Sequence, residues 1–165
     1  MKVHIGKYPK DFTKRKVSIR IDPWDTWNMD TTLALIIVPM LKQLKETKNG
    51  APQVDLEDVP EELRDTPAQL VGERIEDGNY FKRWEYVLDE MIFAFESKNI
   101  LWEDQFWKKL PELDSSEHPE DEGEGVFPLR VTDPGECDRD GMTAYQARMS
   151  NGFRLFGKYY EALWD

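Results

Sequence analysis

The sequence contains few of the residues from which catalytic and metal centres are most often built. Its 165 residues include one cysteine, Cys137, and two histidines, His4 and His118. A single cysteine excludes a disulfide within the chain. Neither histidine has another histidine or a cysteine at the spacing of a zinc site, and the acidic neighbours of Cys137 disfavour its reactive thiolate form. We therefore expect neither a bound metal nor a cysteine nucleophile.

Motifs of the common enzyme classes are missing as well. The chain has no Gly-x-Ser-x-Gly elbow, no glycine-rich phosphate loop and no dinucleotide-binding fingerprint. Glu85, Asp89 and Glu90 share one predicted helix, but the Glu-x-x-His pairs of helical di-metal sites are absent. We interpret these carboxylates as a solvated face. The sequence predicts a protein that is not an enzyme, with no catalytic residue and no cofactor.

Long hydrophobic runs are also absent. The longest, residues 33–41, has nine residues, whereas a membrane-spanning helix needs about 20. No basic segment followed by an apolar one opens the chain as a signal peptide does. The length suits one domain over residues 1–165, since domains most often have roughly 100–150 residues. We expect a soluble, intracellular protein with no membrane partner.

Charge is abundant but unevenly placed. The net charge is −11, which argues against general nucleic-acid binding because phosphates repel an acidic surface. Residues 1–20 nevertheless carry seven bases and one acid, a charge of +6 that leaves −17 on the rest. This asymmetry predicts either a local anion-attracting face or a solvated basic hairpin. Such a hairpin could pair with the acidic body of the same chain or of another copy.

The first part of the chain predicts a small β-hairpin followed by a long helix. Residues 3–6 and 17–21 alternate apolar and polar side chains, and such a hairpin must pack on a helix or pair with another strand to be stable. Asp22-Pro23 predicts the helix start, with Asp30 as a rival, and Asn49-Gly50 the end. Helical spacing predicts a buried face of Leu33, Ile36, Ile37, Met40, Leu41 and Leu44.

The rest of the chain completes a mainly α fold with three long helices. The second helix is predicted at about residues 80–98 and the last at about 141–163, with a short helix at 101–110 between them. Residues 51–79 and 111–141 are rich in acids and read as surface loops. The last helix carries a heptad-like apolar seam through Gly152, which permits close helix approach. That seam could pack internally, as we expect, or against a second copy.

The best candidate for a binding site is the segment that opens the first helix. Trp24 and Trp27 are three residues apart and could present two rings for stacking on a base. Arg20 precedes them, and Arg154 and Lys158 in the last helix could contact phosphate. The predicted ligand-binding residues are therefore Arg20, Trp24, Trp27, Arg154 and Lys158. The alternative, which the sequence favours, is that both tryptophans fill the core while Asp22 and Asp25 cap the helix.

Four segments resemble a small protein encoded widely by tailed bacteriophages. They are residues 19–30 (IRIDPWDTWNMD), 38–45 (VPMLKQLK), 83–92 (RWEYVLDEMI) and 151–160 (NGFRLFGKYY). The resemblance implies an accessory viral protein of the host cytoplasm. Phage proteins of this kind often counter host immunity, and one class sequesters the cyclic nucleotide signals of the CBASS and Thoeris systems, usually as a symmetric oligomer.

Several functions follow from these observations. The first is a non-catalytic, homo-oligomeric anti-defence protein that sequesters a small phosphate-bearing nucleotide. The second is an acidic protein–protein inhibitor or DNA mimic that binds a host defence factor, motivated by the −17 outside residues 1–20. The third is a virion or assembly component, and the remaining option is an enzyme that acts on nucleotides.

Overall fold

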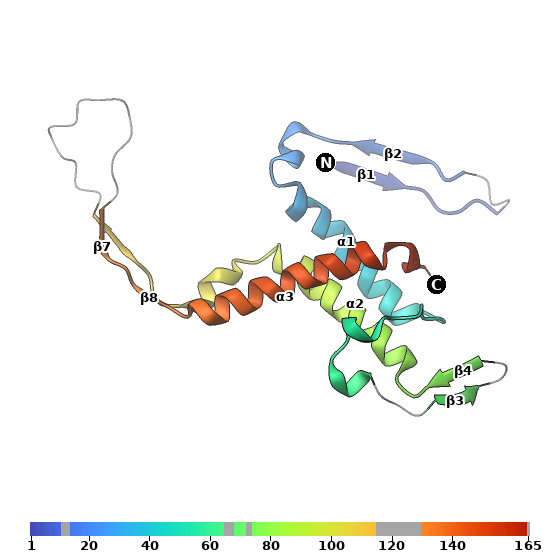
Figure 1. Cartoon of the computed structure of the whole chain (residues 1–165). Helices are drawn as coiled ribbons and strands as arrows, with labels where there is room; N and C mark the ends of the chain where they lie inside the picture. Colours follow the sequence, from blue (N-terminus) through green and yellow to red (C-terminus); the bar gives the residue numbers. More distant parts are fainter. Residues whose placement is uncertain (11–13, 65–67, 72–73, 115–129, 165) are drawn as a thin grey trace.

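The computed structural model describes residues 1–10, 14–64, 68–71, 74–114 and 130–164. Its body consists of three helices, α1 (Met29–Thr47), α2 (Tyr80–Ser97) and α3 (Arg139–Lys158), from which β-hairpins project (Figure 1). The predicted mainly α class is therefore confirmed. In the part of the chain that the structure describes, no helix is both long and apolar enough to cross a membrane.

The core is built around α2, which packs between α1 and α3. Its residues Trp84, Val87, Leu88 and Met91 have at most 1% of their surface exposed, and Leu155 of α3 is buried in the same cluster. The α2 stripe was predicted from helical spacing, and most of it is buried. Its first member, Phe81, is exposed instead, because it lies in the first turn of α2, beyond the core cluster.

The seam of α3 packs internally. Gly152 is buried, and a Cβ atom placed on it would lie 2.5 Å from the Cβ of Ala94 in α2, so the two helices meet there with almost no space between them. Met149 and Tyr159 of the same seam are also buried. The expected internal contact is confirmed, and those seam residues are not free to bind a second copy. The helix ends at Lys158, earlier than predicted, and a 3₁₀ turn, η5 (Tyr160–Ala162), follows.

The first helix begins later than the predicted start at Asp22. Asp22 instead caps a separate 3₁₀ turn, η1 (Pro23–Thr26), and α1 starts at Met29 with Asn28 as its N-cap. The capping box at Asp22 satisfies the donors of this short turn only. Asn28 has backbone angles of φ −120° and ψ 62°, which interrupt the helix, and asparagine is a favoured residue at such a boundary. The rival start at Asp30 is closer to the observed one.

The predicted buried face of α1 is only partly covered. Leu41 is buried, but Leu33 and Met40 are exposed, Met40 to 67%. Ala34 is the other fully buried residue of this helix. Helical spacing identified an apolar face, but α2 covers only a narrow stripe of it, so the remainder of that face is open.

The two segments predicted as acidic loops contain regular structure. The first includes two 3₁₀ turns and a β-hairpin: η2 (Leu56–Asp58), η3 (Glu61–Leu63), β3 (Ala68–Val71) and β4 (Arg74–Asp77). Between the two loops, the short helix predicted at residues 101–110 is instead a 3₁₀ turn, η4 (Trp102–Phe106), followed by a strand, β5 (Trp107–Lys109). The second loop supplies β6 (Glu112–Asp114), β7 (Arg130–Asp133) and β8 (Glu136–Cys137). Residues 115–129, which include His118, lie outside the described part.

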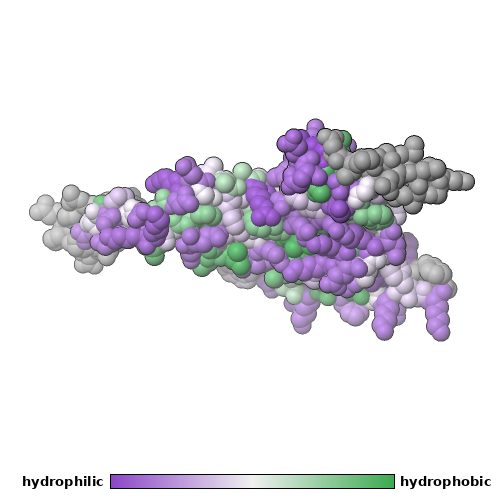
Figure 2. Space-filling model, turned by 90° about the horizontal axis from the view of Figure 1, so that it is seen from below, coloured by the Kyte–Doolittle hydropathy of each residue, from purple (hydrophilic) through white to green (hydrophobic). Residues whose placement is uncertain are grey.

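The predicted N-terminal hairpin is present and projects from the body. Strands β1 (Lys2–Ile5) and β2 (Val17–Arg20) pair antiparallel, with Val3 opposite Ile19 and Ile5 opposite Val17. We call residues 1–21 the arm. The expectation that this hairpin packs on a helix or another strand is wrong within one chain, because every residue of both strands is exposed. Figure 2 shows apolar patches on the surface of the helical body, among hydrophilic residues.

Candidate functional site

Trp24 and Trp27 lie on the surface. Their exposed fractions are 76% and 78%, and their ring centroids are 5.9 Å apart with the ring planes tilted by 39°. The interpretation that they fill the core is therefore wrong. They stay outside because η1 precedes α1 as a separate turn, so neither ring lies on the face of α1 that meets α2.

Hydrogen bonds within η1 hold the backbone that carries the two rings. The backbone N–H of Asp22 donates to the Asp25 carboxylate at 2.7 Å, and the Thr26 hydroxyl donates to the carbonyl of Pro23 at 2.8 Å. The N-terminal ammonium of Met1 lies 2.7 Å from the Asp25 carboxylate. Its hydrogen bond and that of the Asp22 backbone lower the pKa of Asp25. The tryptophans are thus displayed by an ordered turn.

The arm next to this turn carries cations that the described residues do not neutralise. The Arg15 guanidinium lies 4.2 Å from the centre of the Tyr8 ring and donates to the carbonyl of Gly6. The remaining bases of the arm form no ion pair with any residue that the structure describes; they are Lys2, Lys7, Lys10, Lys14, Lys16 and Arg20. The body differs, because Lys42, Lys45 and Lys98 each face a carboxylate within 2.6 Å.

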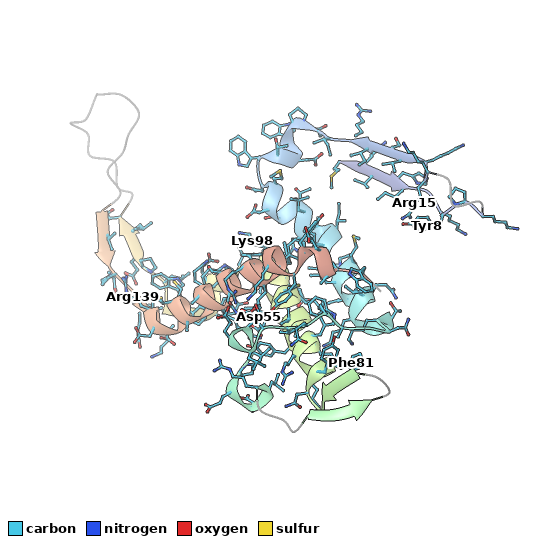
Figure 3. The ribbon with its side chains drawn as sticks, turned by 45° about the vertical axis from the view of Figure 1, so that its right-hand side comes forward. Tyr8, Arg15, Asp55, Phe81, Lys98 and Arg139 are labelled. Atoms are coloured by element: carbon cyan, nitrogen blue, oxygen red, sulfur yellow. The ribbon has the colours of Figure 1, made fainter. Side chains whose placement is uncertain are left out.

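Arg154 and Lys158 are in a different place and have different partners. Arg154 pairs with Asp58 at 2.5 Å, and Lys158 lies 2.7, 3.3 and 2.6 Å from Asp55, Glu57 and Asp58. In Figure 3, Asp55 lies against the helical body, apart from Tyr8 and Arg15 in the arm. The five predicted ligand-binding residues therefore fall into two groups, and the structure does not bring them together.

The cluster around Asp58 holds η2 on α3. The Asp58 side chain is 1% exposed and accepts a hydrogen bond of 2.7 Å from the hydroxyl of Tyr159, which itself accepts one from the backbone N–H of Asp55. Burial opposes ionisation of Asp58, but the donors Lys158, Tyr159 and Arg154 outweigh it and lower its pKa. Burial and the hydrogen bond to Asp58 raise the pKa of Tyr159 to about 12.

This cluster also brings three carboxylates together at the spacing of metal ligands, which the sequence did not reveal. Carboxylate oxygens of Asp55, Glu57 and Asp58 lie within 4.8 Å of one another. The ammonium group of Lys158 is within 3.3 Å of all three, so it already supplies the positive charge that a metal ion would bring. We assign the cluster to stabilisation of the fold.

The helical carboxylates considered for a di-metal site also have cationic partners. Glu85 pairs with Lys48 at 3.0 Å and Asp89 with Lys45 at 2.5 Å. Glu90 is buried and receives two nitrogens of Arg148, at 2.9 and 2.7 Å. This hydrogen-bonded pair raises the pKa of Arg148. The three carboxylates thus connect helices instead of forming one site.

A large apolar cavity was not predicted from the sequence. It has a volume of about 1120 Å³ and lies between the arm, α1 and the end of α3, where its lining includes Tyr8, Met40, Leu44, Tyr160 and Trp164. The exposed half of the apolar face of α1 forms one wall. The sequence contained the signal, an apolar face wider than one neighbouring helix covers, but did not indicate that part of it stays open.

Comparisons with known proteins do not assign a function to these residues. No family model, curated protein or solved structure matches the chain. The features that bear on function are the exposed tryptophans, the arm cations without an ion pair among the described residues, and the cavity.

Proposed function

We propose that the protein is a non-catalytic binding protein that captures a small phosphate-bearing nucleotide on η1 and the arm. One observation carries this proposal: an ordered turn displays two exposed tryptophans beside cations that have no acidic partner among the described residues. An indole ring binds a base by stacking, which contributes about 1–3 kcal/mol per base. Arginine and lysine supply the charge-assisted hydrogen bonds that phosphate requires.

The ring geometry limits how the base is held. A base between two parallel rings needs a ring separation of roughly 7–8 Å, since carbon atoms in contact are about 3.5–4.0 Å apart. The observed centroids are 5.9 Å apart and the planes are tilted, so the ligand stacks on an outer face of the pair and is not enclosed between the rings. Arg20 at the end of β2 is the predicted phosphate contact closest to them in sequence.

The proposed setting follows from the resemblance of four segments to a protein of tailed bacteriophages. In that setting the protein acts in the host cytoplasm and its ligand is a cyclic nucleotide signal of host immunity. Capture without cleavage is consistent with a site made of aromatic rings and cations. The alternative is an acidic inhibitor or DNA mimic, motivated by the charge of −17 outside residues 1–20. Two of the described acids, Asp58 and Glu90, are buried against arginines and do not contribute to such a surface.

Calorimetry tests the proposal. The protein at micromolar concentration is titrated with cyclic dinucleotides, cyclic trinucleotides and cyclic ADP-ribose isomers. We expect one of these classes to bind, and Trp24→Ala or Trp27→Ala to weaken that binding by about tenfold or more. Leu101→Ala is the control, because Leu101 is also 78% exposed but belongs neither to η1 or the arm nor to the lining of the cavity. Absence of binding across the panel contradicts the proposal.

A second measurement separates capture from catalysis. The complex is heated to unfold the protein, and the released nucleotide is examined by chromatography and mass spectrometry. A sequestering protein returns the ligand intact, whereas an enzyme returns a product. Arg20→Gln should weaken binding and reduce its dependence on salt, since it removes one phosphate contact.

A further inference from the structure

The arm has an apolar face that no described residue of its own chain covers. Val3, Ile5, Val17 and Ile19 lie on one face of the hairpin, because directly opposed residues of antiparallel strands share a face. Their exposed fractions run from 40% to 57%. A two-stranded hairpin is marginally stable on its own, so this face is expected to be covered when the protein is assembled.

The cavity beside the arm is a second uncovered apolar surface. Its volume of about 1120 Å³ exceeds the roughly 300–1,000 Å³ typical of small-molecule pockets. Apolar side chains form most of its wall, and Gln43 and Thr47 are the polar residues that line it. Such a surface suits the apolar side chains of a protein segment better than it suits a phosphate-bearing ligand.

The distribution of charge indicates which protein segment covers the cavity. The arm carries +6 and the rest of the chain −17. On α1, Glu46 lies between the lining residues Leu44 and Thr47, and Glu161 lies next to Tyr160. Both glutamates are exposed and have no ion pair among the described residues. An apolar, cationic strand pair therefore complements an apolar cavity with acidic neighbours, and the same chain contains both.

We propose that two copies of the chain form a symmetric dimer in which the arm of each copy covers the cavity of the other. Such an exchange is closed, because each contact is repeated by the two-fold axis. It covers both apolar surfaces and brings the positively charged arm of each copy against the acidic body of the other. The proposal is independent of nucleotide binding, since neither Trp24 nor Trp27 lines the cavity.

Sedimentation velocity of the full chain tests the dimer. The chain mass is 19.4 kDa, and we expect about twice this value at micromolar concentration, falling toward the monomer in high salt. Ile19→Ser on the arm and Met40→Lys in the cavity, which adds a charge of the same sign as the arm, should each shift the protein to the monomer. His4→Ser is the matched control, because His4 is exposed on the opposite face of the hairpin. Circular dichroism establishes that each variant is folded.

Mixing the two variants identifies the contact. A dimer of Ile19→Ser with Met40→Lys retains one intact arm and one intact cavity that face each other, so the mixture should associate more strongly than either variant alone. Arms that pack on arms, or cavities on cavities, cannot be rescued in this way. A monomeric wild-type protein, or a mixture no better than its components, overturns the proposal. A monomer would leave the cavity to a different partner and would not affect the nucleotide titration.

Discussion

Gly152 shows how strongly one residue can limit the approach of two helices. Because a Cβ there would contact the carbonyl of Glu90 and lie 2.5 Å from the Cβ of Ala94, Gly152→Ala must push α3 away from α2. We expect a loss of about 2–3 kcal/mol in the free energy of unfolding, as for overpacked cores, measured by urea denaturation.

Gly157 provides the matched control for that substitution. It lies in the same helix, and nothing lies within 4 Å of a Cβ placed on it. Gly157→Ala should therefore stabilise the protein by about 0.5–1 kcal/mol, since alanine is the better helix former. Equal effects of the two substitutions would contradict the close contact between α2 and α3.

Single residues were predictable where local chemistry decides their role. Gly152 was predicted to allow a close helix approach because it lies on the apolar seam. Asp22 was predicted to cap the first long helix; it does act as a cap, but of the separate turn η1. The exposure of Trp24 and Trp27 was not predictable, because it depends on Asn28 separating η1 from α1. The partners of Arg154 and Lys158 were also hidden, since Asp58 lies almost 100 residues earlier in the sequence and reaches them only after folding.

At the scale of elements, the outcome depended on how many neighbours each helix has. Helix α2 lies between α1 and α3, so its apolar stripe is buried and its bounds were close to the prediction. Helix α1 has α2 on one side only, and helical spacing alone cannot say which apolar residues find a neighbour. The hairpins in the supposed loops were missed because their strands are short and charged; β6, for example, consists of Glu112–Asp114.

The hairpin that follows η4 depends on Gly135. Its φ of 72° lies in the left-handed region, and a Cβ there would be 2.8 Å from the backbone nitrogen of Pro111. Gly135→Ala should therefore loosen the pairing of β5 with β8 and of β6 with β7. We expect faster hydrogen exchange at backbone amides of β6 and β8, with unchanged protection in α2. Gly50→Ala, at an open position, is the control and should leave both regions as they are.

At the scale of the molecule, charge is separated between the arm and the body. Lysines of the arm have no ion pair within the part of the chain that the structure describes, whereas body cations such as Lys158 hold segments together. The composition predicted this separation, since the counts of acids and bases along the chain are sequence properties. It could not predict which charges remain free, because that depends on contacts between distant segments. In both proposals the cations of the arm contact a ligand or a partner, whereas the cations of the body stabilise its fold.

The buried carboxylate of Asp58 links the stability of the whole molecule to pH. Its pKa is lower in the folded protein than the ordinary value of about 3.9. Its contribution to stability is therefore complete above that ordinary value and is lost as the pH falls through the lowered pKa of the folded state. The free energy of unfolding should decline between about pH 5 and pH 2, and part of that decline belongs to this one group.

The substitution Asp58→Asn isolates the contribution of Asp58 to this pH-dependent decline in stability. The variant should be less stable than the wild type at neutral pH by about 2–3 kcal/mol, because the hydroxyl of Tyr159 and two cations lose a charged acceptor. Toward pH 2 the two unfolding curves should converge, since the wild-type carboxyl is then neutral as well. Glu57→Gln, which removes an exposed carboxylate from the same lysine, should change stability by less than about 0.5 kcal/mol at any pH. Parallel curves for Asp58→Asn and wild type across this range would show that Asp58 does not carry the proton linkage.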